Sequence, residues 1–86
     1  MRRPWVTSPS YEIAIRHLID ARKSVGLSQR ELAERLNKPR SFVSKLESRE
    51  RRLDIVEFIA YARALGLEPA VVAGQLSEIL PDILEF

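Results

Sequence analysis

The chain has 86 residues and a formal net charge of +2, with 45% hydrophobic and 30% charged residues; this length allows a single domain, and this balance is typical of a folded globular protein. It contains no cysteine and one histidine, which excludes disulfides and thiolate chemistry and predicts neither a metal site nor another cofactor. Nothing in the sequence resembles a signal peptide and no apolar run approaches about 20 residues, so we expect a cytoplasmic protein with no membrane partner.

Start and stop signals for helices divide the chain into short segments, beginning with two at the N-terminal end. The first helix follows Ser8–Pro9, a cap candidate with proline at the first helical position, and ends before Gly26. The second begins with a capping box, Ser28–Glu31, and ends at Asn37, a residue that tolerates the left-handed conformation. Apolar residues at helical spacing are Tyr11, Ala14, Ile15, Leu18, Ile19 and Val25 in the first helix, and Leu32, Ala33 and Leu36 in the second.

Three further helices follow the same logic. The third begins at Pro39 without a good side-chain cap, the fourth begins with the box Asp54–Glu57 and ends at Gly66, and the fifth runs from Pro69 to Pro81. The expected inward residues are Val43 and Leu46 in the third, Ile55, Phe58, Ile59, Ala62 and Leu65 in the fourth, and Val72, Leu76, Ile79 and Leu80 in the fifth. No segment alternates like a strand, so we expect an all-α, compact five-helix bundle forming one domain over residues 1–86, with its core in residues 9–73.

The second and third helices are separated by only a few residues within Ser28–Glu47. Such a short turn forces two helices to cross steeply and leaves the second one projecting from the surface. Because Val43 and Leu46 point inward, the third helix turns a polar, basic face without any acid outward, formed by Arg40, Ser41, Ser44, Lys45 and Ser48. A face of this kind suits the major groove of DNA.

Charge is distributed unevenly along the chain. Residues 28–52 contain eight basic and four acidic side chains, whereas residues 68–86 contain four acidic side chains and no basic one. This split predicts one surface for a polyanion and another for a different partner.

These motifs resemble the lambda-repressor-like, Cro-type helix-turn-helix family, also called the xenobiotic response element (XRE) family. From about Leu18 to Val72 the chain shows R-x-x-x-G-L-S-Q, E-L-A-x-x-L, S-x-V-S-K-L-E and A-L-G-L in the family's order and spacing. The resemblance implies a lambda-repressor-like fold, double-stranded DNA as partner, and regulation of transcription without enzyme activity. We expect a dimeric repressor.

The resemblance also implies roles for individual residues. Gln29 would meet a phosphate and steady the third helix; Arg40, Ser41, Ser44 and Lys45 would face bases; Arg51 and Arg52 would touch the DNA backbone. For Phe42 two interpretations stand side by side: contact with a thymine methyl or a backbone sugar, or packing on Pro39 and the second helix.

The chain departs from the family pattern at three points. Asn37 replaces the usual glycine in the turn, Lys38–Pro39 replaces the usual cap of the third helix, and Arg49 replaces the glycine expected after that helix. The last difference leaves the conformation of residues 48–52 open.

Arg22 lies on the apolar stripe of the first helix, where an unpaired charge is costly. Glu47 follows the inward residue Leu46 and is the nearby acid on the inner side of the third helix. We expect the two to form a partly buried, structural ion pair, as the equivalent residues do in the family.

The C-terminal segment has more apolar side chains than the flank of a small bundle needs. It could cover the chain's own core, or form a homodimer interface through Leu76, Ile79, Leu80, Ile83, Leu84 and Phe86. An alternative function is an antitoxin whose C-terminal segment binds a toxin, and a third is a module that binds another protein and no longer binds DNA.

Overall fold

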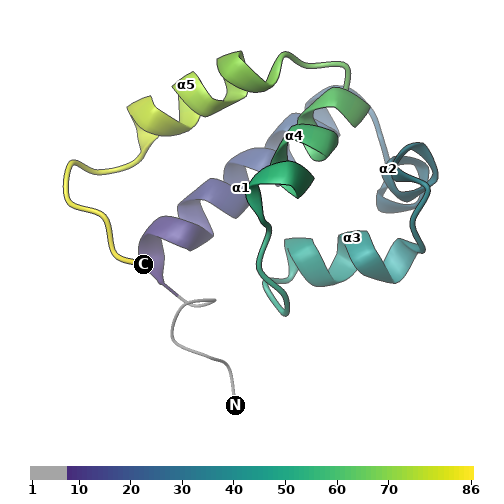
Figure 1. The fold of residues 1–86 in the computed structure, drawn as a ribbon, viewed down its shortest axis with the longest axis horizontal. Coiled ribbons are helices and arrows are strands. Elements are labelled where there is room, and N and C mark those ends of the chain that lie inside the picture. Colours follow the sequence, from purple (N-terminus) through teal and green to yellow (C-terminus); the bar gives the residue numbers. More distant parts are fainter. Residues whose placement is uncertain (1–7) are drawn as a thin grey trace.

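The computed structural model describes residues 8–86, so the first seven residues of the expected domain lie outside it. Five helices follow one another within this range, without any strand: α1 (Pro9–Ser24), α2 (Gln29–Leu36), α3 (Arg40–Glu47), α4 (Ile55–Ala64) and α5 (Pro69–Ile79) (Figure 1). The expected all-α fold is confirmed. None of these helices is both long and apolar enough to cross a membrane.

The helices begin where their capping residues stand. The hydroxyl of Ser8 accepts a hydrogen bond from the Tyr11 amide at 3.3 Å, and reciprocal capping boxes open α2 at Ser28 and α4 at Asp54. Such bonds satisfy amide groups that have no partner inside the helix. By contrast, α3 follows Pro39 with no side-chain cap, as the sequence predicts.

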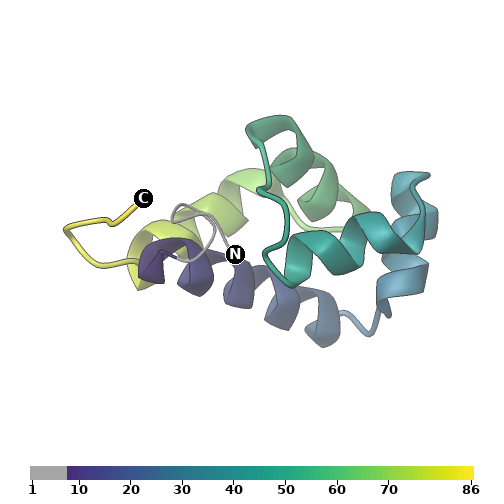
Figure 2. The same ribbon diagram turned by 90° about the horizontal axis from the view of Figure 1, so that it is seen from below.

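A core of apolar side chains joins the helices. Its buried members are Ile15, Leu18, Leu27, Leu32, Ala33, Val43, Tyr61, Ala62, Leu65 and Val72. Helices α3 and α5 lie on opposite sides of α1 (Figures 1 and 2). Seen from the α3 side in Figure 2, α3 stands in front and α5 lies behind. The outer face of α3 is therefore free of the rest of the bundle.

Two expected inward positions are wrong, Ile55 in α4 and Ile79 in α5, and the latter is 47% exposed. Ile55 is the first residue of α4 and is 79% exposed, because within residues 8–86 no other segment covers its side chain. The buried stripe begins one turn later and includes Tyr61, which is 1% exposed and which the sequence analysis did not place inside. Tyr61 lies three residues after Phe58 and four before Leu65, so helical spacing could have identified it.

The C-terminal segment folds back along α1. The Nε2 atom of His17 on α1 lies 2.9 Å from Oε1 of Gln75 on α5, and the amide of Glu85 donates to the Ser10 hydroxyl at 3.0 Å. The end of the chain consequently lies beside the start of α1 (Figure 1).

Helix α3 ends in a left-handed residue that is not glycine. Arg49 has φ 64°, and the amides of Arg49 and Glu50 donate to the carbonyls of Leu46 and Lys45. The same pattern of two bonds ends α1 at Gly26 and α4 at Gly66, which have φ 82° and 77°. Arg49 adopts this conformation at a cost of about 1–2 kcal/mol, since its Cβ crowds the backbone there. Its Nε is also buried and has no hydrogen-bond partner within residues 8–86.

We predict that Arg49→Gly raises the free energy of unfolding by about 0.5–1 kcal/mol, because it removes the backbone strain and the unsatisfied Nε while making the unfolded chain more flexible. Arg49→Val should lower it by about 1 kcal/mol, since a β-branched residue tolerates the left-handed region least. Urea denaturation followed by circular dichroism measures both. If Arg49→Gly were less stable than the wild type, the inference that the backbone is strained at Arg49 would be wrong.

Candidate nucleic-acid interface

Helix α3 has one buried face and one exposed face. Val43 and Leu46 are 0% and 2% exposed, whereas Arg40, Ser41 and Lys45 are exposed. Neither Arg40 nor Lys45 has a carboxylate or ring partner among the described residues. These two cations are therefore open to an external anion or to base edges.

Two of the three serines predicted on this face, Ser44 and Ser48, are less exposed than Ser41. Ser44 and Ser48 are half-buried. The hydroxyl of Ser44 donates to the carbonyl of Ser41 at 3.2 Å, and the hydroxyl of Ser48 donates to Oε2 of Glu50 at 2.7 Å. Each can still accept a hydrogen bond, but its proton is already engaged within the protein.

A buried carboxylate holds the inner side of α3. Arg22 and Glu47, which the sequence pairs, form a bidentate ion pair: Nε donates to Oε2 at 2.8 Å and Nη2 to Oε1 at 2.9 Å. Glu47 also accepts from Nε2 of Gln29 at 3.0 Å and from the Tyr61 hydroxyl at 2.7 Å. The remaining terminal nitrogen of Arg22 donates to the Leu27 carbonyl at 2.6 Å. The network thus joins α1, α2, α3 and α4 at one point.

The network favours the ionised form of Glu47. Burial opposes ionisation, but the hydrogen bonds from Arg22, Gln29 and Tyr61 outweigh it and hold the pKa of Glu47 below its usual value. Burial, together with the neighbouring carboxylate, raises the pKa of Tyr61, so its hydroxyl remains a donor. Arg22 and Glu47 are each 7% exposed, so water screens their interaction poorly.

Gln29, the predicted phosphate contact, lies at the first turn of α2. One amide proton is engaged with Glu47, and the other can still donate to a ligand. Beside it is a basic hollow of about 430 Å³ lined by Arg22, Ser28, Gln29, Arg30 and Arg40. The hollow therefore adjoins both the start of α2 and the start of α3.

The two arginines predicted to touch the DNA backbone have partners within the protein. Nη1 of Arg51 donates to Oε2 of Glu57 at 2.9 Å, and the Arg51 guanidinium lies 4.9 Å from the centre of the Phe42 ring. The Arg52 guanidinium lies 4.4 Å from the centre of the Tyr11 ring. Both are half-buried: Arg51 lies against Phe42 of α3, and Arg52 lies against Tyr11 of α1.

Phe42 contacts two cations, Arg51 and Lys38, and Lys38 was not among the residues predicted to contact DNA. Its half-buried ring lies 5.6 Å from Nζ of Lys38 and also faces Arg51. Lys38 lies in the turn between α2 and α3. Its position in this turn is the only sequence signal that could have indicated Lys38 as a candidate site residue.

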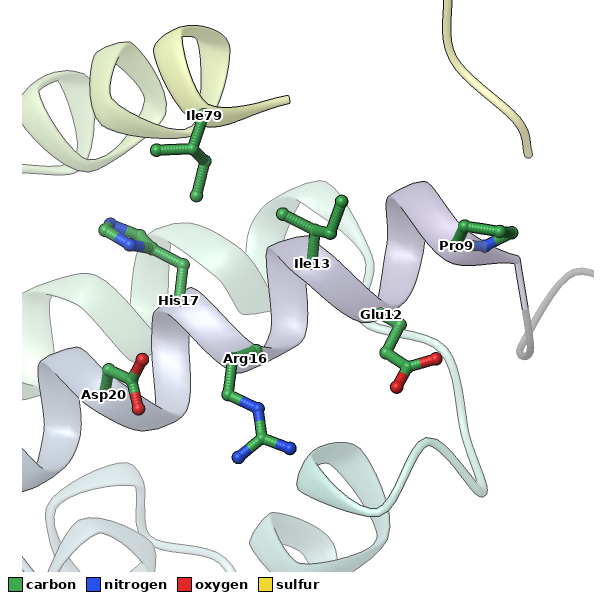
Figure 3. Close-up of a pocket in the computed structure, with 7 residues that line it drawn as sticks. All are labelled: Pro9, Glu12, Ile13, Arg16, His17, Asp20 and Ile79. Atoms are coloured by element: carbon green, nitrogen blue, oxygen red, sulfur yellow. The ribbon is translucent and has the colours of Figure 1, made fainter. Parts of the chain in front are cut away.

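The six residues predicted to form a dimer interface differ in exposure. Leu76 and Leu80 are half-buried, Ile79 and Leu84 are 47% and 45% exposed, and Ile83 and Phe86 are 84% and 91% exposed. Ile79 reaches from α5 toward His17 and Ile13 on α1, where the surface has a hollow of about 460 Å³ (Figure 3). The segments that carry these residues, α5 and the chain end after it, lie away from α3 (Figures 1 and 2).

Comparison with known proteins agrees with this architecture. The helix-turn-helix family model matches residues 18–72. The chain is also similar to a solved structure described as an XRE-family like protein from Pseudomonas syringae pv. tomato str. DC3000, with 42% identity and a TM-score of 0.78 over 84% of this chain and 88% of that one. No curated protein matches the chain.

We predict that Glu47→Gln destabilises the protein by about 3 kcal/mol or more at pH 7, because it leaves the Arg22 charge buried without a counter-charge. The folded-state pKa of Glu47 is lowered, so its contribution is complete above the unfolded pKa of about 4.3 and is lost as pH falls through the folded pKa. The difference between variant and wild type should therefore shrink at pH 3.

Urea denaturation at both pH values measures this effect, with the exposed Glu34→Gln as a control that leaves stability unchanged. Tyr61→Phe is a milder variant that removes one hydrogen bond to the carboxylate and should cost about 1–2 kcal/mol. An equal loss at pH 7 and pH 3 for Glu47→Gln would show that the charge is not responsible.

Proposed function

The chain belongs to the XRE-type helix-turn-helix family, and from this premise we propose that it binds specific sequences of double-stranded DNA and regulates transcription. The observation that supports this most directly is the exposed face of α3, where Arg40 and Lys45 lack partners among residues 8–86. In this binding mode α3 lies in the major groove and α2 crosses the DNA backbone.

Base contacts come from the exposed face of α3 in this proposal. Arg40 and Lys45 pair with guanine O6 and N7, since a cation with several donors matches that edge. Ser41 donates to or accepts from a neighbouring base, and Ser44 acts mainly as an acceptor because its proton is bound to the Ser41 carbonyl. Phe42 belongs to the edge of the same surface.

Phosphate contacts flank the groove. Gln29 and the free amides at the start of α2 bind one phosphate, which the helix dipole also attracts. Arg51 and Arg52, which follow α3 in the chain, bind the DNA backbone at another point. Most of the affinity is electrostatic and falls as salt concentration rises.

We further propose a homodimer that acts as a repressor by occupying its site, as a single-domain cytoplasmic protein without catalytic activity or cofactor. The C-terminal residues Leu76, Ile79, Leu80, Ile83, Leu84 and Phe86 form the contact between copies, since Ile83 and Phe86 are 84% and 91% exposed. A two-fold arrangement places the two α3 helices about 34–36 Å apart, which corresponds to one turn of DNA.

The same exposed apolar residues favour a second candidate, an antitoxin. In that case the C-terminal segment, which has four acidic and no basic side chains from residue 68 to 86, binds a toxin rather than a second copy. Purification together with a small toxin-like chain would support it. A folded chain that binds no DNA at low salt would instead support a module that interacts only with proteins.

We predict that selection from a random duplex library at moderate salt yields a palindromic motif with half-sites one turn apart.

Arg40→Ala or Lys45→Ala should weaken binding by about 1–3 kcal/mol and relax the preference at one base pair, because a base contact is lost. Arg51→Ala should weaken binding to all duplexes alike and reduce the slope of log Kd against log[salt] by about 1. A uniform loss with Arg40→Ala would contradict base contact at that position.

Replacing Ile83 and Phe86 together by aspartate should dissociate the homodimer, because two desolvated carboxylates would face each other across the interface. Analytical ultracentrifugation should then show a monomer with unchanged circular dichroism. The matched control is Val56→Asp, an equally apolar exposed residue (75% exposed) on α4. A monomeric wild type would contradict the proposed dimer.

A further inference from the structure

The ring of Phe42 brings together two cations from different segments. Lys38 belongs to the turn between α2 and α3, and its Nζ lies 5.6 Å from the ring centre. Arg51 belongs to the segment after α3, and its guanidinium carbon lies 4.9 Å from the same centre. Cations within about 6 Å of a ring centre are attracted to its π face.

The Phe42 side chain is half-buried and packs against the apolar core. It lines a cavity of about 250 Å³ between α2, α3 and α4, whose other walls include Leu36, Leu46, Val56 and Tyr61. Leu46 and Tyr61 are 2% and 1% exposed, so the inner wall is rigid core. The ring therefore offers a stable platform on which the two longer side chains are held.

Arg51 is oriented from its other side by α4. Its Nη1 donates to Oε2 of Glu57, while Oε1 of Glu57 accepts from the amide of Asp54 at 3.0 Å as part of the capping box. Both oxygens of Glu57 are thus engaged. The other N–H groups of Arg51 make no hydrogen bond within the described part of the chain, and the side chain is partly exposed.

The positive charges of Lys38 and Arg51 repel each other across the ring, and only one carboxylate, that of Glu57, is bonded to this pair among the described residues. Lys38 is exposed and has no carboxylate partner in residues 8–86. The cluster of Lys38, Phe42 and Arg51 consequently keeps an excess positive charge and several free donors, and these are the properties of an anion site.

We infer that Lys38 and Arg51 together bind the phosphate backbone of DNA, and that Phe42 is a positioning residue which holds them for this contact. The inference rests on the proposed DNA binding and assigns Lys38 a contact and Phe42 a role that involves no base. The side chains on and near α3 then have two roles. Arg40 and Lys45 contact bases, and the cluster of Lys38, Phe42 and Arg51 fixes the position of α3 against the DNA backbone.

The test compares Phe42→Leu, which keeps apolar volume but removes the π face, with Phe42→Tyr, which keeps the ring. Phe42→Leu should weaken binding by about twofold to fivefold, equally for a selected duplex and a scrambled one, and should reduce the slope of log Kd against log[salt] by about 1. Phe42→Tyr should keep the affinity and the salt slope of the wild type. Lys38→Ala should also weaken both duplexes equally, and its effect should be smaller in the Phe42→Leu background.

Arg63→Ala, which removes an exposed cation from the last turn of α4, is the matched control and should leave binding unchanged. In the free protein, the side-chain protons of Lys38 and Arg51 should show upfield ring-current shifts by NMR that Phe42→Leu abolishes, whether or not DNA binds. Changed preference at one base pair with an unchanged salt slope would overturn the inference in favour of base contact by Phe42. Absence of DNA binding by the wild type, with the ring-current shifts present, would instead refute the proposed function and the phosphate role with it.

Discussion

The structure depends on one buried carboxylate. Glu47 on α3 receives two hydrogen bonds from Arg22 on α1, one from Gln29 on α2 and one from Tyr61 on α4. A buried charge is tolerated only when its partners are all in place, because removing one leaves the others desolvated and unpaired. Four helices must therefore take up their mutual positions together, and α3 cannot rotate or slide without breaking this set of bonds.

That constraint explains how a helix of two turns can present a defined surface. Helix α3 has eight residues and no side-chain cap, so it would be unstable in isolation. Burial of Val43 and Leu46, together with the Glu47 network, supplies the missing stability from its inner side. The backbone positions of Arg40 and Lys45 on the outer side are then fixed before a ligand arrives, so binding orders only their side chains.

The chain separates two kinds of surface. Cations gather around α3, including the pair that the Phe42 ring brings together from the turn before the helix and the loop after it. Apolar and acidic side chains gather near the C-terminus, where the tail returns to α1 through the bond between Glu85 and Ser10. In the proposed function, this separation keeps the acidic side chains of the C-terminal segment away from the phosphates of DNA.

The sequence by itself determined where the helices begin and end, because capping boxes, Gly26, Gly66 and Asn37 act through their nearest neighbours in the chain. It also indicated the partner of Arg22, since a charge on an apolar stripe requires an opposite charge nearby. Only the tertiary structure decided which apolar residues are covered, as the exposure of Ile55 shows. It alone placed Lys38 and Arg51 on one ring and gave Arg49 a left-handed backbone, because these features depend on how separate segments pack rather than on local sequence.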